Sequence, residues 1–437
     1  MKVEAFSLRN YRSFLDRTRV ELRPLTLLFG YNSAGKSALL RSLPLIAASC
    51  NEQNGSVVSL GSSVARGAAF QDLLPHPSLS PQRELAWELD FRDDAGGRQT
   101  TGVVSWTIRD LPELRRQVVE KLELRETVGL DELKATWMPA VTGPGRLGTD
   151  YSLVLRDQTF EPINLRFQGL IPRFETGTGA FANEVRASLV SVQEVMESFP
   201  AWGQRVQWLT SVRDLPRRSF AWRGSAPDTL DPHGGGAADV LAYDQLEGGR
   251  VIEEVSKWYE RNLGWRLRVV PVEDQFKLVL EPLLNSPVQV NLADAGEGLI
   301  QVLPVLVAAA RTRRTGLSSG VLAVEEPESH LHPRLHAALA ERFCELAALR
   351  APPQIILETH SENMLLRVQL AVADGQLDPA RVMVYWIRQY EDGRSSAEPI
   401  CFDQLGRPLG NWPPGVFQED LDQARKLVAK QRERLGQ

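Results

Sequence analysis

The sequence contains few cysteines and no long apolar run, and both absences exclude large classes of protein. Its three cysteines, Cys50, Cys344 and Cys401, are too few and too widely spaced for a disulfide framework or a metal-ligand pattern. No stretch of about 18 consecutive apolar residues occurs, so we expect no transmembrane helix and no membrane association. The start of the chain also lacks the apolar core of a secretory leader. We therefore expect a soluble, cytoplasmic protein whose cysteines stay reduced.

An excess of positive charge is also absent. The chain has 50 lysines and arginines against 55 aspartates and glutamates, which gives a net charge of -5. This balance excludes a wholly basic nucleic-acid coat protein, although it leaves room for a local basic face. With 43% apolar and 24% charged residues, the composition is that of a globular protein. A length of 437 residues suggests two or three domains and allows a large core without disulfides.

The two ends of the chain carry the pattern of an α/β fold. Short apolar runs that alternate with helical stretches are typical of buried parallel strands joined by helices. In these parts we predict strands over residues 25–29, 321–324, 354–357 and 381–387 and helices over 36–46, 298–312, 333–349 and 361–372. The predicted core is therefore split, because its two halves are separated by an insertion of mixed α+β structure. We divide the chain into residues 1–98, 99–264 and 265–437.

The middle of the chain gives weaker signals. Alternating apolar residues favour strands, and apolar spacing near 3.6 favours helices. We predict hairpins over 84–91 with 102–108 and over 151–155 with 163–167, helices over 111–137, 185–209 (broken near Pro200) and 237–263, and strands over 267–272 and 276–280. This region carries no obvious chemical motif.

Residues 30–37, Gly-Tyr-Asn-Ser-Ala-Gly-Lys-Ser, match the phosphate-loop pattern G-x-x-x-x-G-K-[ST] without a mismatch. Glycines let the backbone turn sharply and approach phosphate oxygens, and N–H groups at the start of the following helix face the anion. Lys36 is predicted to contact the β- and γ-phosphates, and Ser37 to ligate Mg²⁺. A chance glycine turn is the alternative. The predicted strand, loop and helix are, however, the context that the motif requires, so we expect a nucleotide site.

Two adjacent carboxylates end the predicted strand at 321–324. Because successive side chains of an extended chain point to opposite sides, Glu325 could face the metal while Glu326 faces the attacking water as general base. A solvated acidic strand end is the alternative interpretation. The phosphate loop upstream favours the functional one.

A functional interpretation of two further segments is favoured by their occurrence together with these motifs along the chain. The predicted strand at 354–357 is followed by Glu358, Thr359 and His360. An imidazole there could contact the γ-phosphate, although a single histidine at a strand end is usually structural. Residues 291–298, Asn-Leu-Ala-Asp-Ala-Gly-Glu-Gly, place glycines at the start of an apolar helix. They form either an anion-accepting helix end or an ordinary glycine turn.

The four motifs in this order resemble the ABC-type ATPase family, in particular its RecF/SMC-like prokaryotic branch. The similarity covers about residues 1–50 and 290–370. It is carried by MKVEAFSLRNYRSF and LTLLFGYNSAGKSALL for the first strands and phosphate loop, NLADAGEGLIQVLPVL for the signature segment, VLAVEEPESHLHP for the Walker B strand and ILETHSENML for the switch-histidine strand. The resemblance implies an ABC/SMC-type P-loop ATPase head that uses ATP and Mg²⁺. The segment ICFDQLGRPLGNWPPGVFQED is similar to the C-terminal element of uncharacterised members of this branch.

The resemblance also implies the roles of individual residues and a dimer with ATP between its subunits, alone or as part of a higher oligomer. Glu326 would be the catalytic base and His360 the switch, whereas Ser37, Glu325 and Gln71 would surround the metal. The residues implied in nucleotide binding are Gly30, Asn32, Ser33, Ala34, Gly35, Lys36, Ser37 and Ala38, with Asp294, Gly296 and Gly298 from the signature segment of the second copy. Glu325 stands where aspartate is usual, and the signature segment lacks the usual serine, so slow hydrolysis is conceivable.

An ATPase core does not by itself specify a biological output. Transport is disfavoured because no membrane span is expected, and a double-strand-break tether because residues 100–264 lack long heptads. The ATPase part resembles that of overcoming-lysogenisation-defect proteins, which carry a C-terminal nuclease domain. Only about 75 residues follow His360 here, so we expect no intrinsic nuclease. The first hypothesis is a nucleotide-dependent sensor and scaffold that holds a separate effector protein in prokaryotic antiviral defence.

The alternative hypothesis is a DNA-binding clamp that acts in DNA repair or maintenance. It depends on the basic N-terminal stretch and on a second basic group with interleaved tryptophans, which could contact phosphates and stack on bases. That group comprises Arg205, Arg213, Arg217, Arg218 and Arg223 with Trp208 and Trp222. A solvated loop is the plainer interpretation of the same residues.

Overall fold

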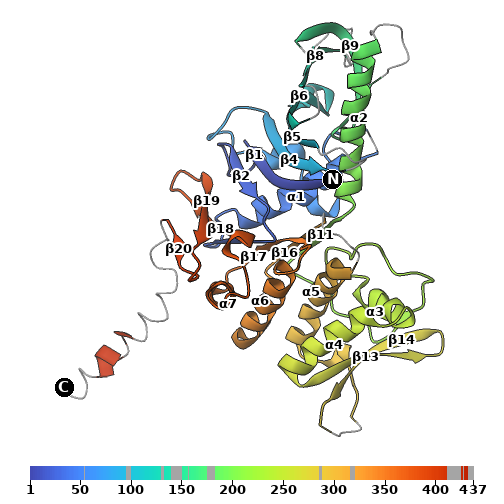
Figure 1. Cartoon of the computed structure of the whole chain (residues 1–437), viewed down its shortest axis with the longest axis vertical. Helices are drawn as coiled ribbons and strands as arrows, with labels where there is room; N and C mark the ends of the chain where they lie inside the picture. Colours follow the sequence, from blue (N-terminus) through green and yellow to red (C-terminus); the bar gives the residue numbers. More distant parts are fainter. Residues whose placement is uncertain are drawn as a thin grey trace.

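The structure is a computed structural model of the whole chain. It describes residues 1–410 except 54, 95–99, 129–131, 139–149, 156, 175–182, 285–287 and 315–319, and it also describes 425, 426 and 428–431. The predicted C-terminal element at 400–420 therefore lies outside the described residues from 411 onward. The described part is elongated, with a large sheet at one end, a second sheet in the middle and helices with a small sheet at the other end (Figure 1).

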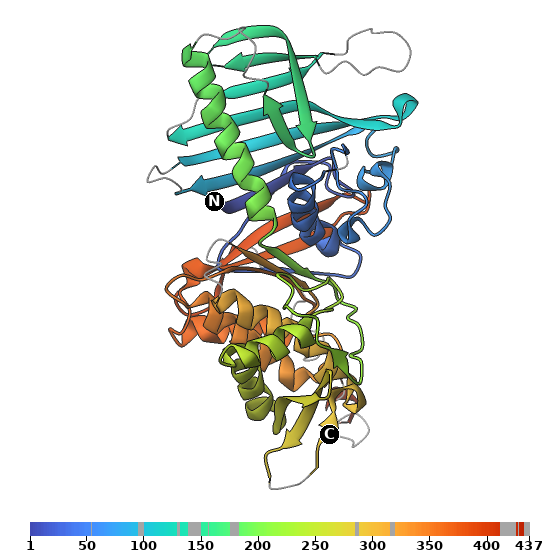
Figure 2. The ribbon, with the colours of Figure 1, turned by 90° about the vertical axis from the view of Figure 1, so that its right-hand side faces the viewer.

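The large sheet has nine strands, and all neighbouring strands run antiparallel. Its order is β10 (Ile171–Phe174), β9 (Gln158–Gln168), β8 (Asp150–Leu155), β7 (Leu133–Trp137), β6 (Arg116–Val128), β5 (Thr100–Leu111), β4 (Glu84–Asp93), β1 (Lys2–Arg9) and β2 (Thr18–Glu21). Helix α2 (Asn183–Gly203) crosses one face of this sheet (Figure 2). Phe91 and Trp106 of the sheet pack edge to face on Phe199 of α2. Both predicted hairpins are confirmed.

The helix expected between Leu111 and Trp137 is wrong, because this segment forms β6 and β7. Its buried residues Val119 and Leu122 are three positions apart, a spacing that imitates one face of a helix. A β-bulge produces this spacing. Glu120 is left out of the pairing with β5, and Val119 and Leu122 pair with Ile108 and Trp106, which face the same side of the sheet. The local pattern therefore came from an irregularity in strand pairing.

The middle sheet has seven strands in the order β11 (Val206–Leu209), β16 (Val321–Glu325), β17 (Gln354–Glu358), β3 (Leu25–Gly30), β18 (Val382–Gln389), β19 (Ser395–Phe402) and β20 (Pro408–Leu409). The first five strands run parallel, and the last two are antiparallel to their neighbours. Strand β3 from the N-terminal part lies between strands of the C-terminal part. The predicted α/β class with a split core is therefore confirmed.

The parallel sheet separates two hydrophobic cores. Neighbouring residues of β3 show this, because Leu28 packs into the core shared with the large sheet and Leu27 into the core on the opposite side. Helix α1 (Lys36–Cys50) belongs to the first core. The second core contains α3 (Ala237–Leu246), α4 (Arg250–Leu263), α5 (Glu297–Arg314), α6 (Pro333–Ala347) and α7 (Glu362–Ala373). Burial on both faces explains why these strands are continuous apolar runs in the sequence.

The remaining elements differ from the sequence-based prediction in two places. Pro200 lies inside α2 without ending it, and the last residues of that predicted helix form β11, which pairs with β16. The helix expected over 237–263 is two helices, because Gly248 and Gly249 take positive φ values of 111° and 66° between them. A small sheet beside these helices contains β12 (Phe220–Ala221), β14 (Gln275–Pro282), β13 (Trp265–Val272) and β15 (Val290–Asn291).

The sheets cross the predicted division of the chain. The nine-stranded sheet joins β1, β2 and β4 to strands of the insertion, and β11 of the insertion joins the parallel sheet. These shared sheets do not test where domains begin and end, and the division into 1–98, 99–264 and 265–437 stays a prediction. None of the helices in the described part of the chain is long and apolar enough to cross a membrane.

Candidate nucleotide-binding site

The predicted phosphate loop lies between β3 and α1, at the carboxyl end of the parallel sheet. Gly35 and Ser33 have φ values of 104° and 63°, so the loop turns through left-handed backbone conformations. A Cβ atom on Gly30 would lie 2.4 Å from the carbonyl oxygen of Ile387 in β18. Glycine at this position therefore lets the loop pass directly over the neighbouring strand.

Lys36 lies folded against its own loop. Its Nζ atom donates hydrogen bonds to the carbonyl oxygens of Gly30, at 3.0 Å, and Tyr31, at 2.7 Å. The residue is buried, and this burial lowers the pKa of the ammonium group. A cation in this position is partly stripped of water, so phosphate oxygens would be better partners for it than the two carbonyls.

The other residues of the phosphate loop differ in exposure, with its middle open to solvent and its end attached to the sheet. Asn32 and Ser33 are exposed, whereas Ala34 is buried. The carbonyl oxygen of Ala34 accepts a hydrogen bond from the Ser395 hydroxyl at 2.8 Å. Ala38 is partly buried in the first turn of α1. The loop can thus receive a ligand without losing its attachment to the sheet.

Ser37 contacts a carboxylate that the sequence-based prediction did not include. Its hydroxyl donates a 2.6 Å hydrogen bond to Oε1 of Glu358, the last residue of β17. Glu358 is 3% exposed, and its Oε2 atom has no hydrogen-bond partner. Burial, reinforced by the negative charges of Glu325 and Glu326, raises the pKa of Glu358 to about 7.

Glu325, the predicted metal-side acid, is held by other residues. Its Oε1 atom accepts hydrogen bonds from Nε of Arg41 at 2.6 Å and from Nε1 of Trp208 at 2.9 Å, and its Oε2 atom pairs with Nη2 of Arg41. The carboxylate is 1% exposed. No hydrogen bond among the described residues joins it to Ser37. The structure thus brings Ser37 to Glu358 and places Glu325 in a buried ion pair.

Glu326, the predicted catalytic base, lies in a strained turn. Its φ of 40° is in the left-handed region, which costs free energy for a residue with a side chain. Three contacts hold the turn: the Glu326 N–H donates to the Glu358 carbonyl oxygen at 2.8 Å, and Nη2 of buried Arg213 donates to the carbonyl oxygens of Glu325 and Glu326 at 2.8 and 3.2 Å. The Ser329 hydroxyl donates to Oε2 of Glu326 at 3.0 Å. The side chain is therefore oriented before any ligand binds.

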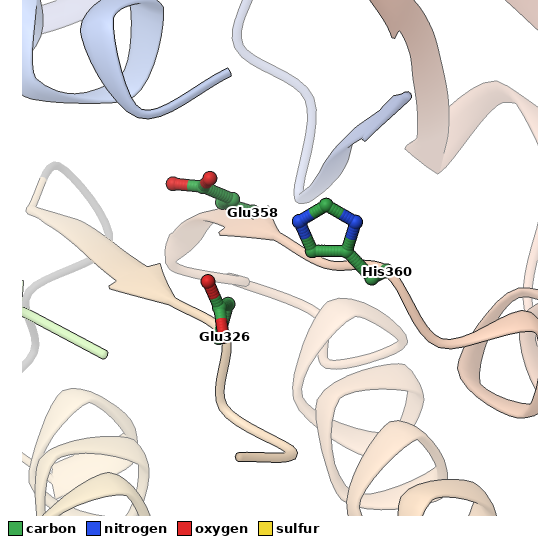
Figure 3. A group of neighbouring side chains, drawn as sticks. All are labelled: Glu326, Glu358 and His360. Atoms are coloured by element: carbon green, nitrogen blue, oxygen red, sulfur yellow. The ribbon is translucent and has the colours of Figure 1, made fainter. Parts of the chain in front are cut away.

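His360 lies beside these acids. One ligand atom each from Glu326, Glu358 and His360 lies within 4.8 Å of the other two (Figure 3). Partial burial and the positive charge of Lys36 lower the pKa of His360. Buried Glu328 fixes the backbone here, because its Oε1 atom accepts hydrogen bonds from the His360 N–H at 3.0 Å and the Thr359 hydroxyl at 2.6 Å. Burial raises the pKa of Glu328.

The remaining predicted residues lie apart from this cluster. Gln71 is exposed in the short 3₁₀ segment Phe70–Leu73, and no hydrogen bond among the described residues connects it to Ser37. In the signature segment, Asp294 forms a two-bond ion pair with Arg218, at 2.6 and 2.9 Å. No described hydrogen bond or ion pair joins this segment to the phosphate loop of the same chain.

The two glycines of the signature segment have different surroundings. A Cβ atom on Gly298 would lie 2.7 Å from the His330 carbonyl oxygen, in the loop after the Walker B strand. Gly298 thus permits close packing of the signature helix on that loop. A Cβ atom on Gly296 would contact only Leu299, at 3.5 Å, so the packing within this chain does not require glycine there.

The basic group expected to form an exposed patch is divided between buried and exposed residues. Arg213 is 3% exposed and braces the Glu326 turn, and burial lowers its pKa to about 10. Trp208 is buried against Glu325, and Trp222 packs on Tyr243 and Phe276. Arg213 and the two tryptophans thus contribute to the core and to the site, whereas Arg217, Arg218 and Arg223 are exposed, so a basic patch that includes these three stays a prediction.

Sequence reasoning missed the positioning residues of the site. Glu358 directly follows the apolar run Ile355-Ile356-Leu357, and Glu328 follows Pro327 closely after the Walker B strand. A polar residue at the end of a buried strand is a usable signal for the first, since these strand ends meet at one edge of the sheet. The inward orientation of Arg41 and Arg213 has no comparable local signal.

Family models match the two parts of the chain that build this site. Residues 1–71 match the model described as "AAA ATPase domain", and residues 268–366 match the one described as "AAA domain, putative AbiEii toxin, Type IV TA system". The first match contains the phosphate loop, and the second contains the signature segment, Glu325, Glu326 and His360. Among curated proteins, none matches the chain.

Solved structures of SMC head domains match most of the chain at low similarity. The SmcHead bound to the C-winged helix domain of ScpA is 10% identical, with a TM-score of 0.49 over 92% of this chain and 98% of that one. The SMC head domain from Thermotoga maritima is 13% identical, with a TM-score of 0.39 over 91% and 99%. The Smc head domain with an extended coiled coil, bound to the C-terminal domain of ScpA from Pyrococcus furiosus, is 10% identical, with a TM-score of 0.46 over 99% of both. Similarities this low carry no conclusion about partners or activity.

The two family matches lie on opposite sides of the insertion, and the strands they contain are neighbours in one parallel sheet. The loop between β3 and α1 has the backbone and the lysine of a phosphate-binding loop. The two segments that are similar to AAA ATPase domains thus build one α/β core around this loop.

Proposed function

We propose that the protein binds ATP with Mg²⁺ at the loop of residues 30–37 and hydrolyses it. One observation carries the proposal: the phosphate loop, with Lys36 and Ser37, faces a cluster formed by Glu326, Glu358 and His360 at the ends of two neighbouring strands. A phosphate-binding loop next to fixed acids and an imidazole is what hydrolysis of a terminal phosphate requires.

The residues of the cluster have distinct roles in this proposal. Lys36 leaves the carbonyl oxygens of its loop and contacts the β- and γ-phosphates, while N–H groups at the start of α1 face the same oxygens. Glu326, oriented by Ser329, accepts a proton from the attacking water. His360 has a lowered pKa, so its neutral imidazole can donate one hydrogen bond to the γ-phosphate.

The surroundings of Ser37 fit a magnesium ion. Mg²⁺ prefers oxygen ligands, and a buried carboxylate oxygen beside Ser37, Oε2 of Glu358, has no hydrogen-bond partner. Ser37 and a carboxylate at a strand end would hold the ion. When bound, it would neutralise charge on the β- and γ-phosphates.

We also propose that two copies of the chain complete each other's sites. No described hydrogen bond or ion pair joins the signature segment with Asp294, Gly296 and Gly298 to the phosphate loop of its own chain, so the segment is available to the nucleotide of a second copy. Gly296, whose glycine identity the packing of this chain does not require, would approach the γ-phosphate of that nucleotide. Assembly of this homodimer, alone or in a higher oligomer, would then depend on ATP.

The biological role that we propose is a sensor and scaffold for a separate effector protein in antiviral defence. The description of the family model that matches residues 268–366 refers to a toxin system, which supports this role. The DNA-clamp alternative keeps only part of its support, because Arg213 is buried whereas Arg217 and Arg218 are exposed. DNA binding by the purified protein that weakens steeply with salt would revive the clamp.

Calorimetry tests the proposal. The wild-type protein should bind ATP in the presence of Mg²⁺, and the Lys36→Ala variant should not. Size-exclusion chromatography of Glu326→Gln with ATP should show a dimer, which disappears when ATP is omitted. Absence of ATP binding by the folded wild-type protein would contradict the whole proposal.

A further inference from the structure

The hydroxyl of Ser37 and the carboxylate of Glu358 form the shortest link between the phosphate loop and the strand ends. The 2.6 Å hydrogen bond uses one carboxylate oxygen of Glu358. The other oxygen has no partner, although the residue is 97% buried (3% exposed). A buried, unpartnered carboxylate oxygen is costly, and it therefore indicates that a ligand completes this position.

Glu325 is in the opposite situation. Both of its carboxylate oxygens are occupied, by the guanidinium of Arg41 and the indole N–H of Trp208. The positive charge of Arg41 compensates the buried negative charge within hydrogen-bonding distance. Moving this side chain toward a metal beside Ser37 would break a buried two-bond ion pair, which is strongly unfavourable.

The order of the strands explains why Glu358 reaches Ser37. Strand β17 lies between β16 and β3, and Glu358 is in register with Glu325 on one side and Leu28 on the other. Its side chain is thus next to the strand that leads into the phosphate loop, whereas Glu325 is one strand further away. One ligand atom each of Glu326 and His360 lies within 4.8 Å of the same carboxylate (Figure 3).

We propose that Glu358 is the protein carboxylate that ligates the nucleotide's Mg²⁺ together with Ser37, and that Glu325 is a structural anchor. This assignment rests on the proposed function, because it presupposes ATP with a magnesium ion at the loop. It moves the metal-side acid from the Walker B strand to the neighbouring strand. The hydrogen bond between Ser37 and Glu358 then keeps both ligands oriented toward the same point.

Two isosteric variants separate the roles of the two acids. Glu358→Gln removes the charge from the proposed ligand, and Glu325→Gln removes it from the anchor as the matched control. ATP binding is measured by calorimetry, first with EDTA and then with Mg²⁺. The affinity for Mn²⁺, which replaces Mg²⁺ as a paramagnetic probe, is measured by electron paramagnetic resonance in the presence of ADP.

Glu358→Gln should still bind ATP in EDTA, but its Mn²⁺ affinity should fall by roughly tenfold or more, and Mg²⁺ should no longer strengthen ATP binding. Glu325→Gln should keep the wild-type Mn²⁺ affinity while its melting temperature falls. Circular dichroism reports whether each variant folds. Glu358→Asp, which keeps the charge but shortens the side chain, should lie between Glu358→Gln and the wild type in Mn²⁺ affinity.

Wild-type Mn²⁺ affinity in folded Glu358→Gln would overturn the inference, as would a selective loss of Mn²⁺ affinity in folded Glu325→Gln. In both cases, ATP binding in EDTA would leave the proposed function intact. A wild-type protein that binds no ATP with or without the metal would overturn the proposed function itself, and the assignment of Glu358 with it.

Discussion

Charged side chains differ in exposure and in ion pairing between the antiparallel sheet and the parallel sheet of this protein. Ion pairs between partly exposed side chains follow the strands of the nine-stranded sheet, among them Arg17–Glu88, Arg19–Asp90, Arg83–Asp110, Arg109–Glu120 and Lys121–Glu123. At the carboxyl ends of the parallel strands, by contrast, Glu325 and Glu358 are 1% and 3% exposed. Within the described residues only Glu325 of these two forms an ion pair.

Burial and the presence of an ionic partner distinguish charged residues that stabilise the fold from those that are available to a ligand. Exposed pairs on the antiparallel sheet keep its outer face hydrated, and each is worth little stability. A buried acid without an ionic partner destabilises the folded protein, and a bound cation can offset this destabilisation. The ends of the parallel strands are therefore where we expect substitutions to change ligand binding and the pH dependence, and the antiparallel sheet is where they should change little.

The largest effect is expected at Lys36. Lys36→Ala removes the only charge that the loop of residues 30–37 offers to phosphate, so ATP binding should fall below detection in calorimetry, a loss of roughly 100-fold or more. Because the described hydrogen bonds of the side chain go only to its own loop, the melting temperature should change little. Unaltered ATP affinity in a folded variant would remove Lys36 from the site.

The largest effect on stability is expected at Arg41. Arg41→Ala leaves the carboxylate of Glu325 buried without its partner, and this should lower the free energy of unfolding by about 3–5 kcal/mol. Chemical denaturation measures the change. A loss below about 1 kcal/mol would contradict the view that Glu325 is anchored in a buried ion pair.

Glu326→Gln should slow catalysis while sparing binding. The amide cannot accept the proton of the attacking water, so turnover should fall by roughly 100-fold or more. The hydrogen bond from Ser329 can still be accepted by the amide oxygen, so the turn should keep its conformation. Phosphate release under saturating ATP measures the change, and unchanged turnover would exclude the base role of Glu326.

The strands and helices that could be predicted are those whose pattern is contained in the local sequence. The parallel strands and their helices were predicted because burial on both faces leaves continuous apolar runs such as Val321 to Val324. Strands β6 and β7 were not, because the bulge at Glu120 gives a helix-like spacing of apolar residues. A bulge is a property of two paired strands, and one strand's sequence does not contain it.

The site shows the same division. Lys36, Ser37, Glu326 and His360 were predicted from local motifs, and the structure brings them together. The contact between Ser37 and Glu358 joins residues 321 positions apart, and it depends on β17 lying between β16 and β3. Likewise, Arg213 was predicted as part of an exposed patch, because charge in a sequence does not reveal that a guanidinium braces a buried turn.

A smaller effect is expected in the pH dependence of stability. Burial raises the pKa of Glu358 from 4.5 to about 7, so the folded state binds this proton more tightly than the unfolded chain does. The resulting stabilisation is complete below about pH 4.5 and is lost as the pH rises through about 7. Without nucleotide, Glu358→Gln should therefore gain stability relative to the wild type between pH 5 and 8, by on the order of 1–3 kcal/mol. A difference that stays constant across this range would show that the pKa of Glu358 is not raised.

The smallest effect is expected at Arg19, the matched control for Arg41. Nε and Nη2 of Arg19 donate to Asp90 at 3.1 and 2.6 Å, so the pair resembles Arg41–Glu325 in chemistry. It differs in burial, because the two side chains are 42% and 22% exposed, against 16% and 2% for Arg41 and Glu325. Water can replace the lost contacts of Asp90, so Arg19→Ala should cost less than about 1 kcal/mol in denaturation and leave ATP binding unchanged. Equal losses for Arg19→Ala and Arg41→Ala would mean that burial does not distinguish the two sheets.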